Sequence, residues 1–133
     1  NGVLDEPAAP TTLEAVRADR QQLQGVWGLV SGSVGGRPNL GDAKVRWTVR
    51  GDQVAVEMAD RWVAKSTLDP SRSPKRINLA ATSADGATEI IRGVYEVRGD
   101  RLCVCLAFGD EPRPESLRCG RNSRQISLVL KRQ

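Results

Sequence analysis

Residues 44–58, KVRWTVRGDQVAVEM, alternate apolar and polar side chains on either side of a short turn. Val45, Trp47 and Val49 share one face of the first half, and lysine, arginine and threonine occupy the other. The second half repeats the alternation after the turn at residues 50–53. A period of two is typical of a half-buried β-strand, so this stretch predicts an antiparallel hairpin with one face toward a core.

The same alternation continues from Gly25 to the C-terminus, interrupted by turn signals such as Asp85-Gly86 and Gly99-Asp100. The predicted strands cover residues 25–31, 44–50, 54–58, 61–68, 77–81, 88–97, 102–106 and 125–132. Strands at this spacing are typical of an all-β sandwich or a closed barrel, and consecutive hairpins favour the barrel. We therefore expect an all-β, eight-stranded antiparallel barrel.

A single helix is predicted ahead of the strands. Residues 11–14, TTLE, match a capping box with Thr11 as the N-cap, and Gly25 provides a natural stop. A stripe at helical spacing follows the cap and comprises Leu13, Val16, Arg20 and Leu23. The apolar members of this stripe are expected to close one end of the barrel, because no other apolar surface is available to them.

The length and composition predict one ordinary globular domain. The 133 residues are 39% hydrophobic and 27% charged, with a formal net charge of +4. Residues 1–10 contain two prolines and no periodicity, which predicts a tail or linker before a single domain at residues 11–133.

Several classes of chemistry are excluded by composition. The chain has no histidine, so it cannot build a Ser-His-Asp relay or a His-ligated metal site. Its three cysteines are too few for a four-thiolate site, and it contains no glycine-rich phosphate-binding motif. We expect neither metal nor cofactor, and no catalytic constellation that would mark an enzyme. No apolar run is long enough for a membrane-spanning helix.

The cysteines favour an oxidising compartment, and hence a location outside the cytoplasm. Cys103 and Cys105 share one face of a predicted strand and lie too far apart to bridge each other without distortion. Either thiol could reach Cys119, and the pair Cys105–Cys119 is our predicted disulfide. The alternative is that all three cysteines are reduced and packed.

Five phrases of the sequence resemble the uncharacterised planctomycete-type lipocalin-like domain. They are LQGVW (23–27), LDPSRSPKRINL (68–79), GVYEVRGDRLCVCL (93–106), RPES (113–116) and LVLKR (128–132). The resemblance covers roughly residues 20–132 and implies a lipocalin-like barrel, but it implies no known activity.

The same resemblance implies a contact at the barrel floor. In lipocalin-like barrels the tryptophan of the glycine-x-tryptophan entry, here Gly25 to Trp27, packs across the floor under a basic residue of the last strand. Because Leu128, Leu130 and Arg132 share one face, the alternation selects Arg132 as that residue.

Two functions are predicted, and the first is a ligand-binding barrel without enzymatic activity. Several residues with inward parity are small, namely Ser31, Ala64, Ser66, Ala81 and Gly93. Beside them, Trp47, Trp62, Tyr95 and Ser66 are predicted to hold a small hydrophobic or amphipathic molecule. The alternative is that the aromatic side chains only fill the core.

The second predicted function is an extracytoplasmic interaction domain with a basic outer surface. Residues 112–133 contain six basic residues and one acid. Four arginines form the predicted patch for an acidic glycan or protein partner: Arg113, Arg118, Arg121 and Arg124. The alternative is a loop whose charges serve solubility. Nucleic acid is an unfavoured partner, because residues 113–124 contain no aromatic side chain for stacking on bases.

Overall fold

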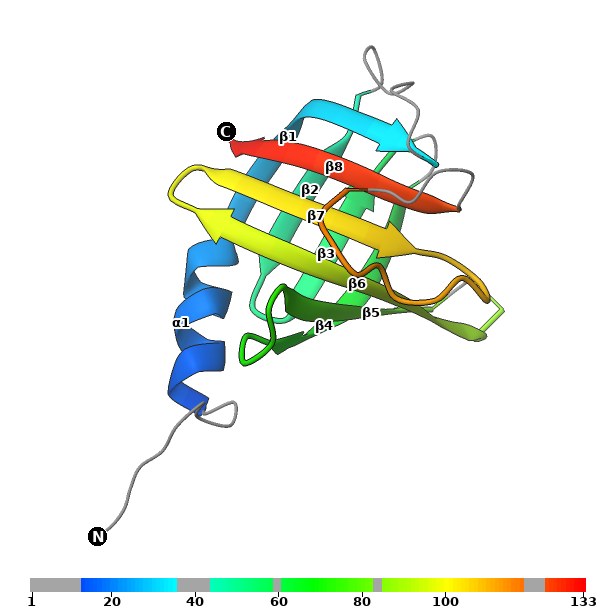
Figure 1. Ribbon diagram of the computed structural model, residues 1–133, viewed down its shortest axis with the longest axis horizontal. Helices are drawn as coiled ribbons and strands as arrows, with labels where there is room; N and C mark the ends of the chain where they lie inside the picture. The colour runs from blue at the N-terminus through cyan, green and yellow to red at the C-terminus, as the bar shows by residue number, and fades with distance from the viewer. Residues whose placement is uncertain (1–12, 36–43, 59–60, 83–84, 119–123) are drawn as a thin grey trace, which may run out of the picture.

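A computed structural model describes residues 13–35, 44–58, 61–82, 85–118 and 124–133. It shows one helix followed by eight strands (Figure 1). The elements are α1 (Leu13–Leu23), β1 (Gly25–Val34), β2 (Arg46–Arg50), β3 (Gln53–Glu57), β4 (Arg61–Asp69), β5 (Lys75–Thr82), β6 (Thr88–Arg98), β7 (Arg101–Ala107) and β8 (Gln125–Arg132). The predicted helix and all eight predicted strands are present, with ends shifted by a few residues.

The strands form a closed antiparallel barrel in sequence order, so the predicted fold class is confirmed. Each strand pairs with the next, and β8 returns to pair with β1 through Trp27 opposite Arg132 and Leu29 opposite Leu130. Closure leaves no unpaired sheet edge, so no strand offers free backbone groups for pairing with a strand of another chain.

The apolar side of each strand lines the barrel interior. The largest fully buried side chains there include Trp27, Trp47, Tyr95 and Leu79. Helix α1 lies at one end of the barrel, at the lower left of Figure 1. Its last turn buries Leu23, and Val16 packs against the same core. The expected closure of this end by the helix is therefore present.

Two expectations about individual positions are wrong. Leu13 does not contribute to the closure, because its side chain is 79% exposed at the start of α1. Ser31 does not face inward, because the register between β1 and β8 shifts between Leu29 and Ser31. A bulge of this kind reverses the alternation, and Ser31 is exposed. Thr11, the predicted cap, lies outside the described residues.

Gly93 does face inward, but it leaves no hollow. A Cβ atom placed on it would lie 2.7 Å from the Cys105 carbonyl oxygen and 2.7 Å from a Leu106 methyl group. The glycine is therefore required by a close approach of β6 and β7, and its small size does not create space for a ligand.

The expected contact between Arg132 and Trp27 is present. The guanidinium carbon lies 4.2 Å from the centre of the indole ring, and the Trp27 Nε1 donates a hydrogen bond of 2.9 Å to the Leu23 carbonyl oxygen. Arg132 also donates to the carbonyl oxygens of Gln22 and Gln24, at the end of the helix. One side chain thus joins the last strand, the first strand and the helix C-terminus.

Gly25 is required at this junction for two reasons. Its φ of 122° lies in a region that L side chains rarely adopt. In addition, a Cβ atom there would lie 3.0 Å from an Arg132 terminal nitrogen. Any side chain at this position would push the guanidinium away from the helix end.

We expect Arg132→Ala to lower the free energy of unfolding by about 2 kcal/mol, because it removes a cation–π contact and charge-assisted hydrogen bonds. For a domain of this size the melting temperature should fall by roughly 5–10 °C, measured by circular dichroism. Lys131→Ala is the matched control, since Lys131 is exposed on the opposite face of the same strand. Equal melting temperatures for the two variants would contradict the role given to Arg132.

Candidate functional site

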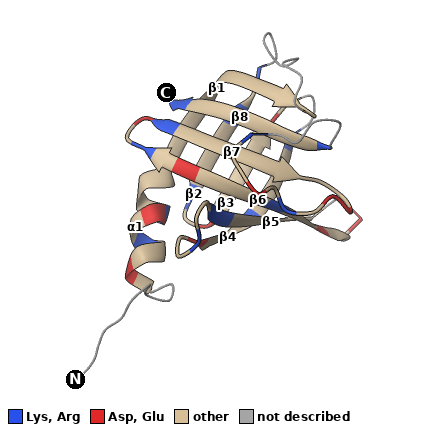
Figure 2. Ribbon diagram, viewed as in Figure 1, with Lys and Arg blue, Asp and Glu red and all other residues tan. Residues whose placement is uncertain are grey.

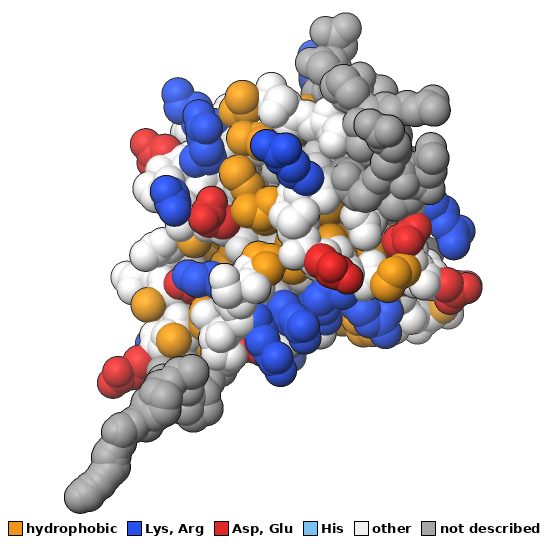
Figure 3. Space-filling model, viewed as in Figure 1, with side chains coloured by type: hydrophobic (Ala, Val, Ile, Leu, Met, Phe, Trp, Pro, Cys, Tyr) orange, Lys and Arg blue, Asp and Glu red, His pale blue; other side chains and the backbone are white. Residues whose placement is uncertain are grey.

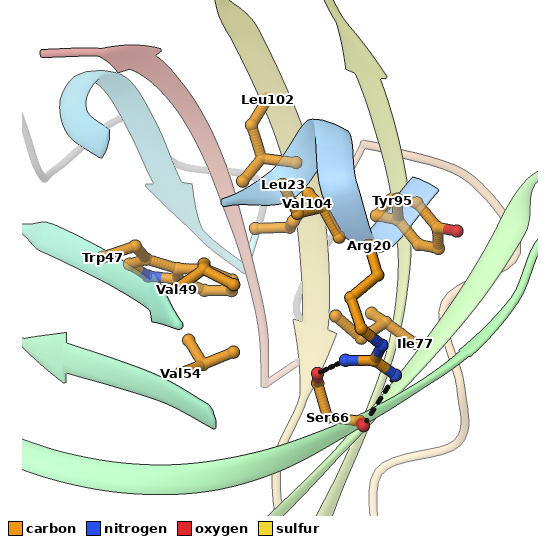
Figure 4. A pocket seen from close by; sticks show the side chains of 10 residues that line it. All are labelled: Arg20, Leu23, Trp47, Val49, Val54, Ser66, Ile77, Tyr95, Leu102 and Val104. Atoms are coloured by element: carbon orange, nitrogen blue, oxygen red, sulfur yellow. Dashed lines mark hydrogen bonds between the residues drawn. The ribbon is translucent and has the colours of Figure 1, made fainter. Parts of the chain in front are cut away.

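The helix-capped end of the barrel encloses a small cavity (Figure 4). Its lining combines side chains of the helix and of six strands: Arg20, Leu23, Trp47, Val49, Val54, Ser66, Ile77, Tyr95, Leu102 and Val104. The cavity volume is about 10 Å³. This is close to the space that a single water molecule needs. This end of the interior is therefore filled by the protein itself.

A buried carboxylate fixes Tyr95 in this end of the barrel. Asp19, only 7% exposed, accepts a hydrogen bond of 2.7 Å from the Tyr95 hydroxyl and one of 2.9 Å from the Lys75 ammonium group. Burial, followed by the hydrogen bond to Asp19, raises the pKa of Tyr95 far above its ordinary value. The phenol is held neutral and serves as a donor to the helix.

A second polar contact joins the helix to β4. The Arg20 guanidinium donates 2.9 Å to the Ser66 hydroxyl, as the dashed lines in Figure 4 show, and 3.3 Å to the Ser66 carbonyl oxygen. The Ser66 hydroxyl in turn donates 3.0 Å to the Asp52 carbonyl oxygen. Ser66 is thus engaged in docking the helix.

The four predicted ligand-binding residues do not form one site. Trp47, Ser66 and Tyr95 surround the cavity under the helix, whereas Trp62 lies at the opposite end of the barrel, which we call the open end because no described element lies across it. A row of paired residues connects the two ends, because Trp27 pairs with Trp47, Trp47 with Val56, and Val56 with Trp62. Strands in a barrel are tilted, so such a row runs obliquely from floor to mouth. Ligand contact by these residues stays a prediction.

Trp47 carries an unsatisfied polar atom. Its indole Nε1 is buried and has no hydrogen-bond acceptor among the residues that the structure describes. A buried donor without a partner costs about 1–3 kcal/mol. The tryptophan is therefore held in place by its packing, with 2% of its surface exposed.

The open end of the barrel holds a larger hollow of about 330 Å³. Its walls are mainly apolar and come from β4, β5, β6 and the residue after β7. The lining residues are Trp62, Ala81, Thr82, Ala87, Thr88, Glu89, Ile91 and Phe108. This volume lies at the lower end of the range of small-molecule pockets, about 300–1,000 Å³. We call this hollow the mouth pocket.

The polar groups of the mouth pocket lie at its rim. Glu89 is exposed, and one of its carboxylate oxygens accepts a hydrogen bond of 3.3 Å from the Gly109 amide. The hydroxyl groups of Thr82 and Thr88 lie 3.4 Å apart on the paired ends of β5 and β6. Glu89 is the one charged side chain among the described lining residues.

The sequence contained signals for two of these residues that we did not use. Phe108 continues the inward series of Leu102, Val104 and Leu106, although it lies one residue beyond β7. Glu89 shares parity with the inward residue Ile91. Asp19, at the other end, shares a helical face with Val16 and Leu23. Its burial cannot be predicted from this position alone, because it depends on hydrogen bonds from Tyr95 and Lys75, which are distant in the sequence.

The arginines of the predicted basic patch lie in different surroundings. Figure 2 shows Lys and Arg spread over the barrel wall and the segment after β7. Arg113 is half-buried and held against the sheet, whereas Arg118 is exposed. Arg124 is also exposed, with its Nε 4.0 Å from a Glu111 carboxylate oxygen. Arg121 lies outside the described residues, so the acidic-partner hypothesis stays a prediction for these loop arginines.

Residues 110–118 cover an outward-facing layer of β6, β7 and β8, across the front of the barrel in Figure 1. Beneath this segment Val94 and Cys105 are buried despite facing away from the core, and Pro114 is buried with them. The Ser127 hydroxyl donates 2.8 Å to the Leu117 carbonyl oxygen.

Of the three cysteines, two lie in the described part of the chain. The Cys105 thiol lies 4.0 Å from a Gln125 side-chain oxygen. Cys119 is not described, so the predicted disulfide remains a prediction. Burial, followed by the charge of Glu96, raises the pKa of the Cys103 thiol. A raised pKa disfavours the thiolate and therefore a nucleophilic role for Cys103.

Comparisons with models of known families, with curated proteins and with solved structures found no match to this chain. Among the described residues, no three carboxylate or thiolate groups converge as a metal site would require. No helix in the described ranges is long and apolar enough to cross a membrane.

Tyr95 is the single tyrosine of the chain, so tyrosinate absorbance reports on it directly. We expect no tyrosinate signal from the folded protein at pH values just above the ordinary tyrosine pKa of about 10. The unfolded chain ionises there and the folded chain does not, so stability should fall as the pH rises through this range. Tyr95→Phe should remove this part of the pH dependence. A folded protein that titrates near pH 10 would contradict the buried hydrogen bond to Asp19.

Proposed function

We propose that this protein is a non-enzymatic binding module that holds a small hydrophobic or amphipathic molecule in the mouth pocket of a lipocalin-like barrel. The observation that carries the proposal is the apolar hollow of about 330 Å³ at the open end. The resemblance of the sequence to the planctomycete-type lipocalin-like domain supports the barrel on which the proposal rests, and it implies no activity of its own. Trp62 and Phe108 supply the aromatic surface.

The contrast between the two barrel ends supports this location. The end under α1 has about 10 Å³ of space and is tied to the helix through Asp19 and Arg20. A ligand there would have to displace the helix and break the buried hydrogen bond from Tyr95 to Asp19 and the part-buried ones from Lys75 and Arg20. Among the described residues the mouth pocket is hollow, so binding there would break none of these hydrogen bonds.

The polar residues at the rim of the mouth pocket favour a ligand whose polar end is cationic or neutral. Glu89 places a carboxylate at the edge of an otherwise apolar pocket, and Thr82 and Thr88 add hydroxyl groups. A ligand carboxylate would be repelled by Glu89, whereas a protonated amine or a hydroxyl group would be accepted. We therefore propose a ligand with an apolar body and a cationic or neutral polar end.

The location is tested by filling the pocket. Ala81→Phe places a ring in the mouth pocket, whereas Ala80→Phe places it on the outer face of the same strand and serves as the matched control. With decanol as the probe, we expect a saturable blue shift of tryptophan fluorescence in the wild type and in Ala80→Phe, because the alkyl chain replaces water beside Trp62. Ala81→Phe should bind at least about tenfold more weakly, because a pocket without free volume cannot take the chain. Unchanged binding in Ala81→Phe would contradict the mouth pocket.

The polar end is tested with three probes of equal chain length. We expect decylamine to bind more tightly than decanol and decanol more tightly than decanoate, measured by calorimetry at neutral pH below micelle formation. In Glu89→Gln the amine should lose up to about fivefold in affinity and the decanoate should gain, because an exposed ion pair contributes up to about 1 kcal/mol. An unchanged ratio of amine to decanoate affinity in Glu89→Gln would exclude Glu89 as the selecting group.

A further inference from the structure

Three arginines that are far apart in the sequence meet on the outer wall of the barrel, away from the mouth pocket. Arg76 lies on β5, Arg92 on β6, and Arg113 on the segment after β7. Asn78 pairs directly with Arg92, and Arg76 lies two residues from Asn78 on the same face. Arg113 reaches this point by donating a hydrogen bond of 2.6 Å to the Asn78 side-chain oxygen. Figure 3 shows Lys and Arg side chains gathered over β5 and β6.

Arg113 is held in one position before any ligand arrives. One of its terminal nitrogens donates to the carbonyl oxygens of Gly93 (2.8 Å) and Ile77 (3.2 Å), and the other donates to Asn78. These bonds use three of the five N–H groups of a guanidinium. The remaining N–H groups belong to a cation whose orientation is already fixed, so a ligand would not have to order it.

The two neighbouring arginines add positive charge, which Asp69, opposite Arg76 in the pairing of β4 with β5, offsets in part. Arg76 and Arg92 are exposed, and neither has a carboxylate oxygen within 4.0 Å among the described residues. The nearby acid, Asp69, is engaged with Arg72 at 3.5 Å and with the Ser71 hydroxyl at 2.6 Å.

The positive charges of Arg76 and Arg92 act on the guanidinium of Arg113. Burial lowers the pKa of Arg113, and the charges of Arg76 and Arg92 lower it further. Three guanidinium groups that repel one another on one face are stabilised by an anion bound between them. Guanidinium groups match oxyanions well, because their N–H groups form paired hydrogen bonds with two oxygens.

We propose that Arg76, Arg92 and Arg113 form a binding site for a doubly charged tetrahedral oxyanion, the phosphate or sulfate group of a ligand. This site is independent of the mouth pocket and lies on the outer wall. It also differs from the basic loop predicted from the sequence, because Arg113 contributes to it while Arg118 and Arg124 do not.

The test follows the arginine side-chain Nε–Hε signals by nuclear magnetic resonance during titration with inorganic phosphate, sulfate or acetate at constant ionic strength. We expect saturable shifts of Arg76, Arg92 and Arg113 with phosphate and sulfate, and much weaker binding of acetate. Absence of saturation with both dianions, or acetate binding as tightly as phosphate, would overturn the proposal.

Two double variants with equal loss of charge locate the site. Arg76→Gln/Arg92→Gln removes both exposed members, and Arg118→Gln/Arg124→Gln is the matched control in the segment before β8. We expect the first to weaken phosphate binding by about tenfold or more, because it removes two of the three guanidinium groups that bond the oxyanion, and the second to change it less than about twofold. Equal weakening by both pairs would show nonspecific attraction and overturn the site. Decanol binding should be unchanged in both, which separates this test from that of the mouth pocket.

Discussion

The stacking of Arg132 on Trp27 is the contact on which the rest of the barrel depends. It lies where β8 closes onto β1, and the same guanidinium holds the carbonyl oxygens at the end of α1. A barrel needs its last strand to meet its first in one register, and an aromatic ring under a cation specifies that register more sharply than apolar packing alone. Because Arg132 also bonds the helix, one side chain both joins the last strand to the first and holds the helix against the barrel floor.

The two ends of the barrel differ in free volume, because polar side chains dock the helix at one end only. At the helix end, Asp19, Arg20, Ser66 and Tyr95 bond to one another or to the backbone, and the remaining space is close to that of one water molecule. At the open end nothing among the described residues occupies the hollow between Trp62 and Phe108. Polar side chains that dock a helix therefore also remove one end of the barrel from ligand binding.

The segment after β7 gives the outer wall its own structure. It buries Cys105 and Val94 on the side of the sheet away from the core, and it fixes Arg113 on the backbone of β5 and β6. An arginine that would be a mobile loop charge thus becomes part of the wall. The consequence is a concentration of positive charge between two strands, separate from the pocket inside the barrel.

The sequence by itself determined the barrel, the helix before it and the partner of Trp27. The barrel follows from a side-chain period of two and from the turn residues between strands, and the helix follows from its stripe at helical spacing. The contact with Trp27 is implied by the resemblance to lipocalin-like barrels, and the parity of Arg132 with Leu128 and Leu130 selects the residue that makes it. Local patterns of this kind depend only on neighbouring residues, so they can be read without knowing which strands meet. Parity failed at Ser31, where a bulge that depends on pairing with β8 reverses the faces.

Only the tertiary structure decided which residues share a site. It separated Trp62 from Trp47 and Tyr95, filled the space beside Gly93 with Leu106, and buried Asp19 against a tyrosine 76 residues away in the chain. It also placed Arg113 beside Arg76 and Arg92 on the barrel wall, apart from the other arginines of the predicted basic loop. The physical reason is that free volume and charge clusters arise from side chains of distant strands, whose separation is set by barrel register and not by any local sequence period.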